Sequence, residues 1–470
     1  MTGDQEADVA VVGGGPAGLH AALVLARGGL RVVLLDESET LGGQYYKRRA
    51  APLAAAFGDF RPHGTELIRR VHEAGVDCRT GTLVWGAEDG GRTLFTSDVR
   101  TGAAGRVRVR ATLAATGAYE RTLPFPGWTL PGVVTAGFAL HLATMDRVPV
   151  GRRVVLAGTG PFLLPVACAL LEVGARIEAL VELNHPYRPR AAALGALRQP
   201  ARLAEAAGYL LTLARHGVHV EQGTRVLAAH GDTRVTAVDL GPATESAGGA
   251  VRRVETDALC VGFGFRPSTE LPQLLGCRST AELPAVDPDG ATSVPGLYVA
   301  GDSAGIAGVH AAGVRGQLAA HAILRHLDAG RPADPADTRR VAVLRRRARS
   351  LDRFAALNDR LFPLPAATVE AIADPTEVCR CEGVTAGEVR QAATTGWNDL
   401  HGAKGATRAG MGLCQGRECG HIVAALAAHG GPGAEPQTFA ARMPLRPVPV
   451  ATALALTSTD PTGRQEVTDR

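Results

Sequence analysis

One stretch of 28 residues constrains the fold of this chain more than any other: VAVVGGGPAGLHAALVLARGGLRVVLLD, at 9–36. It reads as a buried strand, a glycine-rich turn, a helix and a second buried strand that ends in an acid. The three glycines of the G-x-G-x-x-G turn permit, in order, the tight turn, the approach of a pyrophosphate to the backbone, and close packing of helix on strand. The helix would offer free N–H groups to phosphates. The expected phosphate-binding residues are Gly13, Gly15, Pro16, Ala17 and Gly18.

The acid at the end of this unit narrows the choice of dinucleotide. Asp36 stands where a carboxylate binds ribose hydroxyls, and it would repel a 2′-phosphate, so FAD or NAD fits better than NADP. Three later segments resemble loops of two-dinucleotide flavoproteins and favour FAD: LGGQ at 41–44, ATG at 115–117 and GD at 301–302. The resemblance implies cofactor contacts at Gly43, Gln44, Thr116, Gly117, Gly301 and Asp302.

A second glycine loop departs from the pattern. Gly158 and Gly160 follow another buried strand, but Leu163 stands where the third glycine would be. A leucine there moves the helix away from the strand or forces a different packing. Glu182 ends the following strand and could hold a ribose. A structural, regulatory or empty nucleotide pocket is therefore favoured over a site that oxidises NAD(P)H.

Four of the eight cysteines fall close together, as C-x-C at 379–381 and C-x4-C at 414–419. Thiolates are preferred by both iron–sulfur clusters and zinc. Structural zinc sites more often use pairs separated by two to four residues, whereas a one-residue gap suits a two-iron centre. The pattern favours a [2Fe-2S] cluster over zinc or unligated thiols. The expected ligands are Cys379, Cys381, Cys414 and Cys419, and Lys404, Arg408 and Arg417 could offset the cluster's negative charge.

These motifs divide the chain into a discontinuous α/β flavoprotein with a small α-helical appendage. We expect an FAD-type domain at 1–148 and 258–328, an inserted NAD(P)-like Rossmann domain at 149–257, a linker at 329–370, a [2Fe-2S] domain at 371–432 and an extended, peripheral tail at 433–470. The linker contains an amphipathic basic helix at about 338–361. Its apolar stripe suits either its own domain or a partner subunit.

The cysteine segment, CRCEGVTAGEV to GMGLCQGRECG, resembles a bacterioferritin-associated-ferredoxin-type [2Fe-2S] domain. Together with GGGPAG, GGQYY and AGTGPFLLPVA, it makes the chain resemble the α or A subunits of heteromeric amine dehydrogenases. That family includes opine oxidases, D-hydroxyproline or proline dehydrogenases and hydrogen cyanide synthases. The resemblance implies a β subunit whose FAD oxidises a C–N bond, an FMN at the interface between subunits, and an α subunit that passes electrons onward.

The leading expectation is thus an electron-transferring subunit of a flavin-dependent dehydrogenase or oxidase acting on an amino acid, imino acid or opine. Two alternatives stay open: a stand-alone NAD(P)H-dependent flavin/[2Fe-2S] reductase, and a non-catalytic nucleotide- and cluster-binding scaffold. A disulfide reductase is rejected because GGQYYKRR at 42–49 has no cysteine beside the flavin loop. No catalytic residue stands out, since His141, His310 and His401 are isolated in the sequence.

Composition excludes other classes of partner. A net charge of +4 over 470 residues is too small to indicate nucleic acid. No apolar run is long enough for a membrane span. Acidic residues precede the first apolar run, where a secretory signal would have basic ones. A cytoplasmic location is expected.

Overall fold

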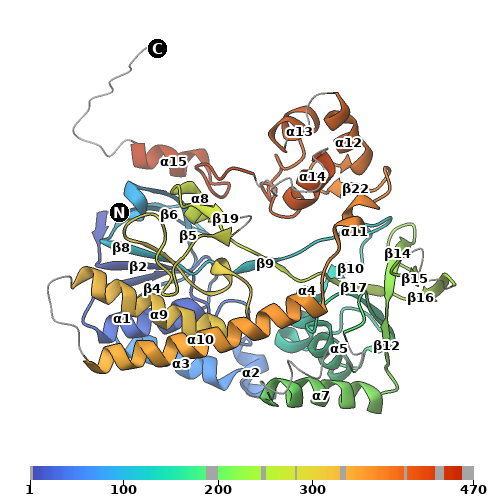
Figure 1. Ribbon diagram of the computed structural model, residues 1–470, viewed down its shortest axis with the longest axis horizontal. Helices are drawn as coiled ribbons and strands as arrows, with labels where there is room; N and C mark the ends of the chain where they lie inside the picture. The colour runs from blue at the N-terminus through green and yellow to red at the C-terminus, as the bar shows by residue number, and fades with distance from the viewer. Residues whose placement is uncertain are drawn as a thin grey trace.

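The computed structural model describes residues 4–186, 200–244, 250–280, 283–328, 335–395, 400–428 and 439–457. Its first unit is built on a five-stranded parallel sheet in the order β21-β8-β2-β3-β4 (Figure 1). The strands are β2 (Val9–Val12), β3 (Val32–Leu35), β4 (Asp77–Arg79), β8 (Ala111–Ala114) and β21 (Leu297–Val299). Strands β2, β3 and β8 are buried along their whole length, because the sheet is covered on both faces.

Helices cover one face of this sheet and a second sheet covers the other. The helices are α1 (Pro16–Arg27), α3 (Pro62–Glu73) and α9 (Val309–Leu327). The second sheet, in the order β1-β7-β6-β5, contains β1 (Asp4–Glu6), β5 (Thr82–Glu88), β6 (Thr93–Asp98) and β7 (Ala104–Arg108). Helices α1 and α9 approach closely at Gly316, where a Cβ would lie 2.1 Å from the Ala17 carbonyl oxygen.

The inserted unit repeats this plan. Its parallel sheet, in the order β10-β17-β11-β12-β13, contains β10 (Val133–Thr135), β11 (Arg153–Gly158), β12 (Arg176–Glu182), β13 (Val220–Gln222) and β17 (Ala258–Gly262). One face packs on α4 (Ala136–His141), α5 (Leu163–Glu172) and α7 (Pro200–Arg215). The other packs on the antiparallel sheet of β14 (Thr224–His230), β15 (Ala237–Pro242) and β16 (Arg252–Glu255).

The insertion extends beyond the expected range of 149–257. Strands β10 and β17 and helix α4 belong to the inserted layers. The two units are joined by β9 (Ala118–Glu120) and β18 (Phe265–Pro267), which pair with each other in antiparallel fashion. The sequence misplaces the boundary because β10 has only three residues, and because β17 reads like the buried strands of the first unit.

The linker helix α10 (Pro335–Leu361) lies on its own chain. Val341, Leu344 and Ala348 pack against Val314 and Leu318 of α9. The first part of the apolar stripe therefore follows the first of its two predicted uses, as a contact with its own domain. Figure 1 shows α10 running past α9 toward α11.

The cysteine-containing unit is a small helical layer. It consists of α11 (Ala366–Glu370), the hairpin of β22 (Glu377–Cys379) and β23 (Val384–Thr385), α12 (Ala386–Thr394), α13 (Leu400–Thr407) and α14 (Gly420–Ala427). Helix α12 begins at a capping box that Thr385 forms with Glu388. The core of the unit also includes Leu123 and Phe263, which lie beside the crossing strands. The unit is thus packed onto the rest of the molecule.

The tail differs from the expectation of an extended, peripheral segment. Phe439 lies against the cysteine unit, Leu445 donates its N–H to the Trp85 carbonyl (2.7 Å), and α15 (Val450–Thr457) buries Leu456 beside Trp85. These apolar anchors are single residues without periodicity, so the sequence hides them. Residues 433–438 and 458–470 of the expected tail lie outside the described residues.

The remaining short elements of the described chain are α2 (Ala51–Phe57), η1 (Asp89–Gly91), η2 (Leu142–Asp146), α8 (Glu270–Leu274), β19 (Ser279–Thr280), β20 (Leu283–Pro284) and η4 (Gly301–Ala304). Within the described residues, no helix combines the length and apolarity needed to cross a membrane.

Candidate nucleotide and cluster sites

Steric contacts explain two glycines of the first loop. At Gly13, where φ is +106°, a Cβ would lie 2.3 Å from the Ala115 carbonyl oxygen. At Gly18 a Cβ would lie 1.9 Å from the Gly13 carbonyl oxygen. Gly15 is different. It is the N-cap residue of α1, and it has no side chain that could cover the free N–H groups of the helix. The atom nearest to an added Cβ is the Cα of Gly43, at 3.8 Å. Gly15 thus leaves space at a helix N-terminus, where a pyrophosphate fits.

The other predicted cofactor loops meet this one. A Cβ at Gly43 would lie 2.8 Å from the Gly15 Cα, and a Cβ at Gly301 would lie 2.8 Å from the Ala17 Cβ. The ATG turn adjoins Gly13 through Ala115. Gln44 is exposed on the same loop as Gly43. Segments from four parts of the sequence therefore converge on the N-terminus of α1.

Both predicted acids of the first site are partly enclosed. Asp36 is buried and accepts hydrogen bonds from the N–H groups of Gly14 (2.6 Å) and Ser38 (2.7 Å). A carboxylate has about four acceptor positions, so it can still accept from ribose hydroxyls. Burial raises the pKa of Asp302, whose carboxylate receives a long hydrogen bond (3.5 Å) from Ala307. These loops fit an adenine dinucleotide such as FAD.

In the second loop the helix begins later after the first glycine than it does in the first loop. Helix α5 begins at Leu163, five residues after Gly158, whereas α1 begins at Pro16, three residues after Gly13. Gly158 has no room for a Cβ, which would lie 1.8 Å from the Gly262 carbonyl oxygen. Leu163 is buried, and its Cδ2 lies 3.1 Å from the position of a Cβ at Gly262. As expected, the leucine forces a different packing at the helix start.

Glu182 closes this second loop. It accepts hydrogen bonds from the N–H groups of Gly160 (2.9 Å) and Asn184 (3.0 Å), and burial raises its pKa. The Gly160 contact spans 22 residues, as does the contact between Asp36 and Gly14 in the first loop. Asn184 also donates to the Pro363 carbonyl (2.9 Å). The segment after α10 is therefore tied to the second loop.

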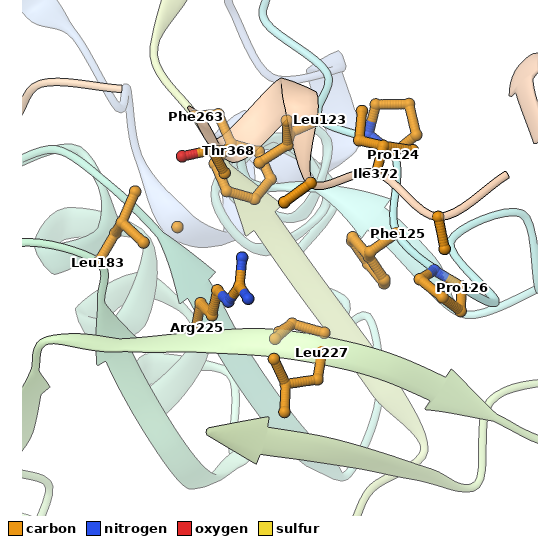
Figure 2. A pocket seen from close by; sticks show the side chains of 14 residues that line it. Leu123, Pro124, Phe125, Pro126, Leu183, Arg225, Leu227, Phe263, Thr368 and Ile372 are labelled. Carbon is orange, nitrogen blue, oxygen red and sulfur yellow. The ribbon is translucent and has the colours of Figure 1, made fainter. Parts of the chain in front are cut away.

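A cavity of about 160 Å³ lies beside Gly158 (Figure 2). Leu183 and Arg225 of the inserted unit line it, together with residues 123–126, residue 368 and residues 371–373. Ligand pockets usually have about 300–1,000 Å³. The cavity is too small for a dinucleotide, and part of its wall comes from the N-terminal part of the cysteine unit.

The four predicted cluster ligands come together. Cys379 and Cys419 are buried, Cys414 is half-buried and Cys381 is exposed. The Cys419 thiol contacts both Cys379 and Cys414, and Cys414 also contacts Cys381. Contact with Cys419 lowers the pKa of Cys379 to about 6 and that of Cys414 to about 5, while these contacts raise the pKa of Cys419. Among the described residues, no group of three or more His, Cys, Asp or Glu side chains is placed around a single metal ion. The four thiols instead form this chain of sulfur contacts.

The backbone around the thiols suits an anionic cluster. Donor N–H groups point at three of the sulfurs: those of Gly410 and Glu382 at Cys379, those of Gly416 and Glu418 at Cys414, and that of Cys414 at Cys381. Such donors stabilise thiolates and tune a bound cluster. Gly410 and Gly416 have φ of +80° and +79°, which lets these turns bring their N–H groups inward. Four thiols with this donor set fit a [2Fe-2S] cluster.

The three histidines that are isolated in the sequence do not gather at either site. His141 lies 3.8 Å from Asp146, whereas His310 and His401 are exposed. Burial lowers the pKa of His141 and of His310.

Sequence reasoning missed the residues that connect the two sites, and one that packs against the cysteine unit alone, Phe439. The connecting residues are Tyr119, Ser268, Glu270, Leu445 and Arg446. Only Tyr119 has a local signal, because it follows the ATG turn closely. The other contacts join segments more than 100 residues apart or fall in the tail, where no single motif records them.

The fold and these sites define a flavoprotein oxidoreductase that carries a C-terminal [2Fe-2S] domain. The family described as pyridine nucleotide-disulphide oxidoreductase matches residues 7–323. The BFD-like [2Fe-2S] binding domain matches residues 377–429. The expected fold class, an FAD-type flavoprotein with a C-terminal [2Fe-2S] domain, is thereby confirmed.

Relatives narrow the family. The chain is 35% identical to the hydrogen cyanide synthase protein HcnB of Pseudomonas aeruginosa, over 87% of this chain and 90% of the relative. It is 33% identical to the A subunit of the opine oxidase of Agrobacterium tumefaciens, over 94% of this chain and 90% of the relative. The crystal structure of L-proline dehydrogenase from P. horikoshii superposes with a TM-score of 0.68 at 22% sequence identity. The superposition covers 96% of this chain and 80% of that chain, which shows a shared fold. The chain belongs to the pyridine nucleotide-disulphide oxidoreductase family, in the group that includes HcnB and the A subunits of opine oxidases.

Proposed function

We propose that this chain is the electron-transferring subunit of a flavin-dependent dehydrogenase or oxidase that oxidises the C–N bond of an amino acid, imino acid or opine. The observation that carries the proposal is the joining of two redox sites in one packed unit. The turn that holds Cys414 is hydrogen-bonded to the FAD-type domain through Arg417 and Tyr119. Electrons can then pass between the sites without a change in domain arrangement.

The cofactors are assigned to the two sites as follows. FAD binds the first loop, with Gly15 and the helix N-terminus facing the pyrophosphate and Asp36 facing a ribose. The four cysteines hold the [2Fe-2S] cluster. A bound flavin supplies two-electron chemistry, and the cluster supplies one-electron transfer. The protein positions the sites and sets their electrostatics.

The partner and substrate follow from the relatives. HcnB and the opine oxidase relative are both named as subunits. By analogy, a β subunit would carry the flavin at which the substrate loses two electrons and two protons, and an FMN would lie at the interface. We place the enzyme in the cytoplasm, where thiols stay reduced and available to iron.

The second loop supports a structural role better than NAD(P)H oxidation. The Asn184 side-chain amide already donates a hydrogen bond to the Pro363 carbonyl, and residues 368 and 371–373 help to enclose the small cavity at Gly158. We expect that neither NADH nor NADPH will bleach the flavin of the purified protein. Rapid bleaching by either would favour the stand-alone reductase instead.

The test uses the chain purified with its partner subunit under anaerobic conditions. Amino acids, imino acids and opines are added one at a time, with flavin absorbance and the electron paramagnetic resonance (EPR) signal of the cluster as readouts. A substrate should bleach flavin and then reduce the cluster. The matched variant Cys414→Ser should assemble and still bleach flavin, but lack the cluster signal and turn over slowly with a one-electron acceptor dye. If no C–N substrate reduces either centre, the proposal fails.

A further inference from the structure

We propose that Arg417 is a positioning residue that docks the cluster-binding turn on the FAD-type domain and raises the reduction potential of the cluster by its buried positive charge. The inference rests on the proposed function for its purpose, but its electrostatic part can be measured without any substrate.

Arg417 lies at the junction of three segments. Its Nη1 donates to the carbonyl oxygen of Cys414 (3.0 Å), and its Nη2 donates to that of Leu445 in the tail (2.6 Å). Its Nε lies 3.2 Å from the Tyr119 hydroxyl and 2.9 Å from a carboxylate oxygen of Glu270. The planar fork of a guanidinium can hold several acceptors at fixed angles, which an ammonium cannot. One side chain thus fixes the ligand turn to two other parts of the molecule.

The contacts continue from Tyr119 to the first nucleotide site. The Tyr119 hydroxyl lies 3.0 Å from the Ser268 Oγ, which donates to Glu270 (2.8 Å). The backbone of Ser268 is held by the ATG turn: Thr116 donates to its carbonyl (2.8 Å), and its N–H donates to the Gly117 carbonyl (2.9 Å). A continuous series of hydrogen bonds therefore joins a predicted flavin loop to the turn of Cys414.

Burial distinguishes Arg417 from the other cations predicted to offset the cluster. Its side chain is 9% exposed. The side chain of Arg408 is 69% exposed and pairs with Glu382 (3.0 Å), while Lys404 lies over the ring of Phe439 (4.9 Å). A charge that is shielded from water acts more strongly on its surroundings than an exposed one. Arg417 is therefore the cation of this set with the largest expected effect.

Neighbouring charges offset Arg417 only in part. Glu270 contributes one negative charge, but Arg446 also donates to the Tyr119 hydroxyl (3.2 Å) and Arg266 donates to the Arg417 carbonyl (3.3 Å). Arg446 in turn lies 3.6 Å from Glu37. Three cations thus face two carboxylates in this series of contacts, while a third carboxylate, that of Glu418, interacts with both Cys414 and Arg380. Because a cluster gains one negative charge when it accepts an electron, a buried cation nearby favours the reduced form and raises the potential.

The experiment compares Arg417→Met with Arg408→Met in the complex with its cofactors. Both changes remove one positive charge from the same domain, one buried and one exposed. The cluster potential is measured by dithionite titration with mediator dyes and EPR detection. Arg417→Met should shift the potential downward clearly more than Arg408→Met. Equal shifts, or an unchanged potential in Arg417→Met, would overturn the electrostatic role.

Two further variants test positioning and protect against loss of the cluster in Arg417→Met. Arg417→Lys keeps the charge but loses the fork, and Tyr119→Phe removes only the hydroxyl. Both should keep a potential near that of the wild type but slow electron transfer from flavin to cluster, measured after flash photoreduction of the flavin. Wild-type transfer rates in both would refute the positioning role. Since neither readout needs a C–N substrate, failure of the proposed function is recognised separately.

Discussion

Replacing Gly15 with alanine should separate cofactor binding from folding. The backbone at Gly15 is extended, with φ of −76° and ψ of −174°, so alanine fits without strain. The nearest atom to the new Cβ would be 3.8 Å away, an ordinary van der Waals contact. We therefore expect the free energy of unfolding to change by less than about 0.5 kcal/mol.

The effect on FAD should be much larger. The added methyl group would fill the space through which the pyrophosphate approaches the helix N-terminus. Loss of a single hydrogen bond to a charged phosphate costs about 1.5–3 kcal/mol. That corresponds to roughly a ten- to hundred-fold weaker affinity. The affinity is measured by titrating the apoprotein with FAD, and the flavin content that remains after gel filtration gives a second measure.

Alanine substitutions at two other glycines serve as controls. Gly18→Ala should destabilise the fold itself by about 1–3 kcal/mol or more, because its Cβ would lie 1.9 Å from the Gly13 carbonyl oxygen. Gly208→Ala, in helix α7 with no atom within 4 Å, should leave FAD binding unchanged and stabilise the helix by about 0.5–1 kcal/mol. Wild-type FAD affinity in a well-folded Gly15→Ala variant would refute the reasoning.

Three other outcomes are expected. Phe439→Ala should hasten iron release to a chelator several-fold, because the ring packs against Gly410 and Gly416 of the ligand turns; unchanged release would show that the tail does not protect the cluster. Since burial raises the pKa of Glu182 above its ordinary value of 4.5, its contribution to stability is complete below that pH and falls as pH rises through the folded-state pKa. The stability of the wild type relative to Glu182→Gln, from urea unfolding, should therefore decrease with rising pH, and an increase would contradict this sign. Gly316→Ala should lower the melting temperature, whereas Gly405→Ala, with open space around it, should not.

Local signals explain what the sequence could predict. All the residues that form the first glycine loop and its flanking strands lie within 28 residues of sequence. Thr385 indicates the start of a helix because it is a favourable N-cap residue. The two cysteine pairs carry ligand chemistry in their spacing. Even the misfit at Leu163 is visible in the sequence, because one side chain replaces a glycine at a known position.

Distant contacts explain what the sequence could not predict. Arg417 and Tyr119 are 298 residues apart, and neither carries a motif that names the other. Phe439 and Leu445 are isolated apolar residues in a proline-containing segment, which resembles an extended tail when only the sequence is considered. The bounds of the insertion are hidden for a related reason, because β10 is recognisable only once it pairs with β17.

A cofactor inventory of the anaerobically purified complex tests the central claim most directly. Iron, acid-labile sulfide, zinc and released flavin are measured together with the visible spectrum. We predict iron and sulfide in equal amounts, as a [2Fe-2S] cluster requires, with FAD present and zinc at background. A colourless protein in which zinc has replaced iron would contradict the assignment of Cys379, Cys381, Cys414 and Cys419 to a redox centre.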